Sequence, residues 1–113
     1  MKKLIFTLTL LFGCFTAATA QIVNIPDANF KNALVNTLCV DTNGDNTGDA
    51  DADTNNDGEI QVAEAQAILS LIVGSRSIAD LTGIQSFVNL QILLCSHNQL
   101  TNLNVQGLAH FRR

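Results

Sequence analysis

The segment LQILLCSHNQLTNL, residues 90–103, places aliphatic or thiol side chains at a fixed set of intervals. The intervals follow L-x-x-L-x-C-x-x-N-x-L-x-x-L, so one asparagine stands among the apolar positions. The same intervals occur 22 residues earlier, and five positions agree in one register. The matched pairs are Ile68 and Leu90, Leu71 and Leu93, Val73 and Cys95, Ile78 and Leu100, and Leu81 and Leu103. Such a period predicts stacked repeat units that bury their apolar faces against one another.

The spacing matches a leucine-rich repeat, an α/β solenoid in which each turn contributes one short strand to a concave face. We expect this strand near residues 93–95, with the leucines inside and Asn98 bonded to backbone groups between the turns. Only Arg76, opposite Asn98, breaks the register, as is reasonable where a first turn abuts a cap. Cys39 and Cys95 could pair in an exported protein, but the repeat favours Cys95 as a small apolar core residue.

An acidic cluster precedes the repeat in DADTNNDGEIQVAEAQAIL, residues 51–69. Counted from Asp53, it matches the D-x-[DN]-x-[DN]-G-x5-E pattern of an EF-hand calcium loop. Alternate oxygen donors surround a hard cation, Gly58 permits the sharp turn, and Glu64 closes the loop with two oxygens. A solvated acidic linker would need neither that glycine nor an apolar Ile60 after it. The predicted Ca²⁺ ligands are Asp53, Asn55, Asp57, the carbonyl of Glu59, Gln61 and Glu64.

The upstream segment DTNGDNTGDADAD, residues 41–53, also alternates oxygen donors and resembles the calcium-binding repeats of thrombospondin type 3. It fails the EF-hand count, because position 6 is Asn46 and position 12 is Ala52. Two alternatives remain open, a second and looser calcium site or a disordered acidic insert. The candidate ligands of the second site are Asp41, Asn43, Asp45 and Asp49.

Two helices are predicted on either side of these loops. Residues 25–39 place Phe30, Leu34 and Leu38 four apart on one face, after Pro26 and Asp27 in the first turn. Residues 62–70 carry a second apolar stripe at helical spacing. Its members are Val62, Ala65, Ile68 and Leu69. The order helix, loop, helix supports the calcium assignment.

Residues 1–20 have the composition of a secretory signal peptide. A basic pair, Lys2 and Lys3, precedes the apolar run 4–15, and the small residues 18–20 form a cleavage site before Gln21. The run is too short for a permanent membrane span. The alternative is a lipoprotein signal anchored at Cys14, although Phe12 suits that recognition poorly.

The mature chain would hold four basic residues against ten acidic ones, a net charge of −6. Eight of the ten acids lie between Asp41 and Glu64, which concentrates the negative charge in one segment. This distribution argues against nucleic acid or anionic lipid as a partner.

Three segments together resemble the N-terminal region of secreted bacterial leucine-rich-repeat proteins of the internalin type. They are IPDANFKNAL, DTNNDGEIQVAEA and IADLTGIQSFVNLQILLCSHNQL. The resemblance implies a helical EF-hand-like cap over residues 21–67, a right-handed solenoid over residues 68–113, extracellular location and ligand binding on the concave face. It also assigns the metal-ligand roles to the predicted residues of the 53–64 loop. The chain departs from the pattern in the insert 41–52. With about two repeats, it is expected to be a fragment or a truncated product.

The function expected from these features is non-enzymatic recognition or adhesion, secreted or at the cell surface, on a calcium-stabilised scaffold. The partner would be a protein or glycan whose identity the sequence does not give. One alternative is a dockerin-like calcium-dependent docking module, which pairs two such loops. The other is the N-terminal part of a larger secreted enzyme, although no acid accompanies His97, and the adjacent Ser96 would face the other side of the strand.

Overall fold

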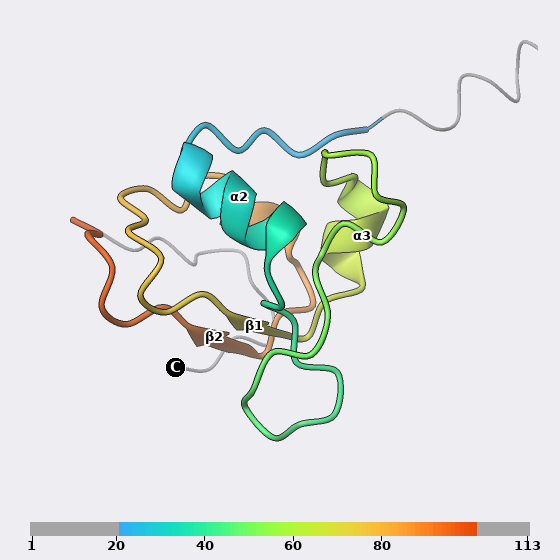
Figure 1. Ribbon diagram of the computed structural model, residues 1–113. Helices are drawn as coiled ribbons and strands as arrows, with labels where there is room; N and C mark the ends of the chain where they lie inside the picture. Colours follow the sequence, from blue (N-terminus) through green and yellow to red (C-terminus); the bar gives the residue numbers. More distant parts are fainter. Residues whose placement is uncertain (1–20, 102–113) are drawn as a thin grey trace, which may run out of the picture.

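The computed structural model describes residues 21–101, which form a small mixed α/β unit (Figure 1). The signal peptide predicted at 1–20, Leu103 and the remaining residues to 113 lie outside the described residues. The elements in chain order are the helices α2 (Ala28–Asn36) and α3 (Val62–Gln66), the strand β1 (Ser70–Ile72), the 3-10 helix η1 (Ile84–Ser86) and the strand β2 (Ile92–Leu94).

The strands β1 and β2 form a two-stranded parallel sheet. Leu71 pairs with Leu93, and the flanking pairs keep the same offset of 22 residues. The register predicted from the leucine spacing is therefore confirmed, with the second strand one residue earlier than expected. The N–H of Val73 donates to the carbonyl of Leu94 at 2.8 Å, which extends the pairing beyond the strand end.

The second edge of β1 is covered by the segment that follows α2. Val40 forms an antiparallel bridge with Leu71 on one side and with Ala50 on the other. The N–H of Ile72 donates to the carbonyl of Cys39 at 2.6 Å. The cap therefore adds backbone to the sheet as well as side chains to the core.

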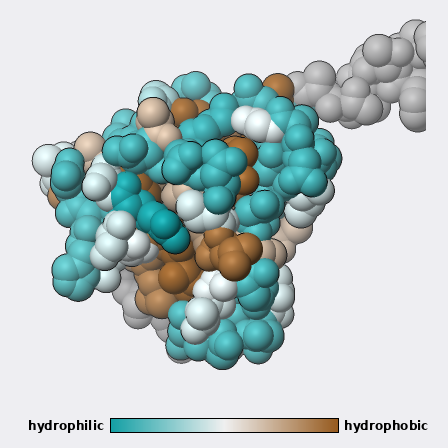
Figure 2. Space-filling view, viewed as in Figure 1, coloured by the Kyte–Doolittle hydropathy of each residue, from teal (hydrophilic) through white to brown (hydrophobic). Residues whose placement is uncertain are grey.

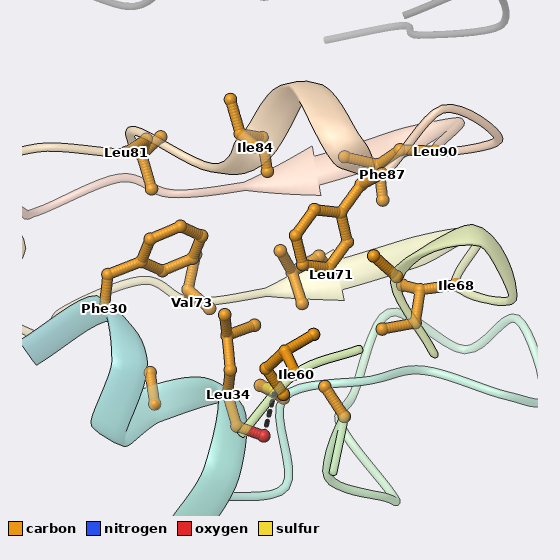
Figure 3. Close-up of a cluster of buried hydrophobic side chains, with 14 of the residues drawn as sticks. Phe30, Leu34, Ile60, Ile68, Leu71, Val73, Leu81, Ile84, Phe87 and Leu90 are labelled. Atoms are coloured by element: carbon orange, nitrogen blue, oxygen red, sulfur yellow. Dashed lines mark hydrogen bonds between the residues drawn. The ribbon is translucent and has the colours of Figure 1, made fainter. Parts of the chain in front are cut away.

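One apolar core joins the cap to the sheet (Figure 3). Phe30 and Leu34 of α2 face the strands, and Ile60 enters from the 53–64 loop; all three are fully buried. Leu71 and Phe87 close the core from the repeat side. Burial of a side chain of this size stabilises a fold by roughly 1.5–3 kcal/mol. Ile60 thus anchors the acidic loop in the core.

The N-terminus of α2 is fixed by a single carboxylate. Asp27 Oδ1 accepts the N–H groups of Asn29 and Phe30, both at 2.9 Å, as an N-cap. Its Oδ2 accepts the N–H groups of Ala79 and Asp80, both at 3.0 Å. Desolvation opposes ionisation, but the four N–H donors outweigh it and lower the pKa of Asp27. The helix start is thus tied to the chain that follows the first strand.

Both helices are shorter than predicted. Because α2 ends at Asn36, Leu38 is not on its buried face and is 60% exposed. Because Ser70 belongs to β1, α3 cannot continue to that residue and ends at Gln66. Ile68 is buried as expected, whereas Leu69 is exposed.

Asn98 connects the two repeat turns by four hydrogen bonds. Its Nδ2 donates to the carbonyls of Val73 at 2.8 Å and Cys95 at 2.9 Å. Its Oδ1 accepts the N–H groups of Arg76 at 2.8 Å and Ile78 at 3.1 Å. The predicted role of this asparagine is confirmed, since it bonds backbone groups of the preceding turn.

Cys39 and Cys95 are not joined by a disulfide. Cys39 is completely buried, and burial raises the pKa of its thiol to about 11. Cys95 lies partly buried against the core, as its place in the repeat predicts. In the described part of the chain, neither helix has the length and apolar character of a membrane span.

Candidate metal centre

The 53–64 loop is organised around the carboxylate at its first position. Asp53 is only 2% exposed, and its two oxygens accept the N–H groups of Gly58 at 2.8 Å and Asp57 at 3.3 Å. Gly58 has φ +81°, and no atom lies within 4 Å of the place where a Cβ would stand. The glycine at position 6 is therefore required by its backbone conformation rather than by crowding.

The side chains at positions 3, 5 and 9 are linked directly to one another. Asn55 Oδ1 accepts the N–H of Asp57 at 3.2 Å, and Asn55 Nδ2 donates to Gln61 Oε1 at 3.2 Å. Gln61 Nε2 in turn donates to Asp57 Oδ2 at 2.7 Å. The N–H of Glu59 is the main cause that lowers the pKa of Asp57, so this carboxylate ionises readily. These three side chains converge on one side of the loop.

Glu64, at position 12, reaches back from α3 across the whole loop. Its Oε1 accepts the N–H of Gln61 at 3.0 Å, which completes a capping box at the start of the helix. Its Oε2 accepts from the N–H of Asn55 at 3.1 Å and from Thr54 Oγ1 at 2.9 Å. The closing acid is thus in contact with both ends of the loop.

The side chain of Glu59 forms an ion pair with Lys31 of α2, at 2.5 Å. The predicted ligand at this position is the backbone carbonyl, so the ion pair does not compete with it. It ties the loop to α2 at a partly exposed site, where such a pair contributes little to stability.

The donor set suits a hard cation, because three carboxylates, two amide oxygens and a carbonyl belong to one loop. Within residues 21–101, however, no three acidic, histidine or cysteine side chains approach one another as a metal cluster. The carboxylate oxygens of Asp57 and Glu64 are bonded to Gln61, Thr54 and backbone N–H groups instead. A bound cation would replace some of these hydrogen bonds.

The 41–49 loop has the same backbone plan. Asp41 is 6% exposed, and its oxygens accept the N–H groups of Gly44 at 2.7 Å, Asn46 at 2.7 Å and Asn43 at 3.1 Å. Although desolvation opposes it, these bonds lower the pKa of Asp41. Asn46 has φ +66° and donates from the sixth position to the first acid, as Gly58 does in the other loop. Asparagine is among the residues that tolerate this conformation, which the glycine-based count missed.

The two loops also agree beyond their first residue. The N–H of Asp45 donates to Asn43 Oδ1 at 3.1 Å, and the N–H of Thr47 donates to Asp45 Oδ1 at 2.9 Å. Asp49 accepts from Thr42 Oγ1 at 2.7 Å, as Glu64 accepts from Thr54 Oγ1. An aspartate at position 9 thus occupies the place of the glutamate at position 12. The repeated D-T-N spacing at 41–43 and 53–55 was the signal for this equivalence.

A second feature lies on the sheet face opposite the core. Leu71 and Leu93 point inward, so the alternate residues of each strand point to the other face. There Leu94 is 38% exposed, and Ile72 and Ile92 are half-buried. Figure 2 shows apolar surface in the lower half of the view, over the strands and beside the 41–50 loop. The apolar face consists of Ile72, Ile92 and Leu94.

Among known proteins, no family model matches the chain, and no curated protein matches it. Solved structures of similar fold include the following two. One contains the CBM51-2 and INT domains of ZmpB from Clostridium perfringens, with a TM-score of 0.54 and 20% identity. The other is an internalin, inlF, from Listeria monocytogenes, with a TM-score of 0.57 and 21% identity. They are matched over 80% and 84% of this chain, which spans only 17% and 25% of theirs. The likeness extends to the fold, and the internalin neighbour fits a repeat architecture.

Proposed function

We propose that the chain is the capped start of a leucine-rich-repeat solenoid that serves recognition or adhesion without catalysis, outside the cell or on its surface. The observation that carries this proposal is the apolar face on the open side of the sheet. Its exposed leucine, Leu94, lies outside the core, beside the half-buried Ile72 and Ile92. Contiguous exposed apolar residues of this kind mark binding surfaces more often than ordinary surface.

Two further observations support the proposal. The signal peptide predicted from the sequence would direct export, and the neighbours in fold are an internalin and a protein with a CBM51 domain. The ligand would be a protein or a glycan, with the apolar face supplying contact area.

We further propose that Ca²⁺ binds the 53–64 loop and that a second, looser ion binds the 41–49 loop. The support for the first ion is the convergence of Asn55, Asp57, Gln61 and Glu64 around the buried Asp53. Extracellular sites of this kind have Kd values of about 10⁻⁴ to 10⁻³ M. Calcium at a hundredfold excess over Kd would stabilise the fold by about 2.7 kcal/mol.

Titration calorimetry of the purified chain with CaCl₂ tests the first ion. Glu64→Gln keeps the shape of the side chain but removes the charge that closes the loop, and we expect it to abolish the tighter binding event. Asp80→Asn, outside both loops, is the matched control and should bind like the parent. A Glu64→Gln protein that binds calcium as tightly as the parent would show that the ligand assignment is wrong.

Hydrogen exchange tests whether the ion supports the recognition surface. Helix α3 carries Glu64, and Ile60 of the same loop is buried in the core with Leu71, so loss of the ion should loosen both. With a chelator we expect residues 90–101 to lose protection together with residues 62–66. Unchanged protection at 90–101 would limit the ion to a local role.

A glycan and protein-array screen tests recognition itself. Leu94→Glu places a charge on the apolar face, and we expect it to weaken any binding by tenfold or more, since each 1.4 kcal/mol is a factor of ten. Gln91→Glu, on an exposed side chain next to β2, adds the same charge as a control. Equal binding by parent and Leu94→Glu would place the binding surface elsewhere.

A dockerin-like docking module remains the second candidate, because the two loops share one hydrogen-bond plan. In that case the partner would contact the helices and loops. Substitutions at Lys31 or Asn32 on the exposed side of α2 would then weaken binding, and Leu94→Glu would not.

A further inference from the structure

The dipeptide Asn43–Gly44 is the only asparagine–glycine pair in the chain, and it lies in the 41–49 loop. We propose that Asn43 is a site of spontaneous deamidation in the folded protein. The backbone nitrogen of Gly44 attacks Cγ of Asn43, loses its proton and forms a C–N bond, while the side-chain nitrogen leaves as ammonia. Water then opens the five-membered succinimide to aspartate or isoaspartate. Water is the only co-reactant, and no electron transfer is involved.

The surroundings of the pair favour the reaction. Both residues are exposed, and Gly44 has φ +86° with no atom within 4 Å of where a Cβ would stand. Residue 44 therefore has no side chain that crowds the attacking nitrogen. The absence of a Cβ also gives the loop the backbone freedom that ring closure requires.

Other candidates in the two loops are less suited. Asn46 is equally exposed, but the next residue is Thr47, whose β-branched side chain crowds the backbone nitrogen. Asp57–Gly58 has the same glycine, but both carboxylate oxygens of Asp57 are engaged, by the N–H of Glu59 and by Gln61 Nε2. An anionic carboxylate also resists a nucleophile more than a neutral amide does.

Two hydrogen bonds oppose the reaction. The N–H of Gly44 donates to Asp41 Oδ1 at 2.7 Å, and Asn43 Oδ1 accepts the N–H of Asp45 at 3.1 Å. Both bonds must open before the ring closes. Because the loop is on the surface, such local opening takes little free energy compared with global unfolding. We therefore expect the folded chain to react more slowly than a free peptide, but within the same experiment.

The product changes the loop. Isoaspartate adds one carbon to the main chain between the third and fourth positions, so the N–H groups of Gly44 and Asn46 no longer fit the carboxylate of Asp41. Aspartate at 43 keeps the backbone and adds a negative charge to a cluster that already holds Asp41, Asp45 and Asp49. The 53–64 loop contains no such pair and is unaffected.

The test is incubation of the purified chain at mildly alkaline pH and 37 °C, followed by peptide mass spectrometry and an isoaspartate methylation assay. A synthetic peptide of residues 41–49 is the positive control, and Gly44→Ala is the blocking variant, with folding checked by circular dichroism. We expect conversion at residue 43 in the folded chain, an intact Asn46, and at least a tenfold slower conversion in Gly44→Ala. An intact Asn43 at a time when the peptide has converted, or an equal rate in a folded Gly44→Ala protein, would overturn the proposal.

Discussion

Replacement of Asn98 by alanine should cost this fold a large part of its stability. The side chain satisfies two carbonyls and two N–H groups, at Val73, Cys95, Arg76 and Ile78. Each such hydrogen bond contributes roughly 0.5–1.5 kcal/mol net. Four bonds at a partly buried position give an expected loss of about 2–4 kcal/mol, because water reaches some of the groups once the side chain is removed.

That loss is measurable by urea unfolding or by a thermal melt. A domain of this size has a total stability of only about 5–15 kcal/mol, and a loss of 2 kcal/mol would lower its Tm by roughly 8–16 °C. Gln99→Ala is the control, because the side chain of Gln99 is exposed and its bond to Ile78 is made by the backbone N–H, which alanine keeps. The stability of this variant should lie within about 0.5 kcal/mol of that of the parent. If Asn98→Ala is no more costly than Gln99→Ala, the contact between the two turns does not depend on this residue.

Two further predictions concern the cap. Because the folded pKa of Asp27 is lowered from 3.8, the stability due to its carboxylate is present above that pH and lost as the pH falls through the folded pKa. The free energy of unfolding of Asp27→Asn, measured by urea denaturation below pH 3.8, should therefore depend less on pH than that of the parent. The same pH dependence in both proteins would contradict this. Gly48→Ala would place a Cβ 1.8 Å from the carbonyl oxygen of Leu38, so a loss of about 1–3 kcal/mol is expected from overpacking. A Gly48→Ala protein that is as stable as the parent would argue against the close contact.

The sequence predicted the contacts that follow from regular spacing. Leu71 lies beside Leu93 because equal intervals bring equivalent residues together. Ile60 is buried because it is the apolar side chain of an acidic loop and packs against the core. The spacing of the apolar residues could not predict where α3 ends, since Ile68 and Leu69 fit the last turn of a helix and the segment that leads into a strand equally well.

The remaining differences arise from contacts between distant residues. Leu38 fits the helical spacing of Phe30 and Leu34, but the chain leaves the helix so that Val40 can pair with Leu71. In the 41–49 loop, the count for a calcium motif depended on a glycine at position 6 and a glutamate at position 12. Asn46 adopts the left-handed conformation without glycine, and Asp49 makes the closing contact from position 9.

The pairing of Val40 with Leu71 makes the two edges of the sheet unequal, because it closes the edge at β1. An open strand edge can recruit any other open edge, including that of a second molecule, and so promotes aggregation. Here one edge of β1 is closed by Val40, which in turn pairs with Ala50, where the chain meets the acidic 41–49 loop. Negative charge at that end repels another copy of itself. Within residues 21–101, the edge of the sheet that stays open is therefore that of β2, and the edge nearer the N-terminal segment is protected from pairing with another copy.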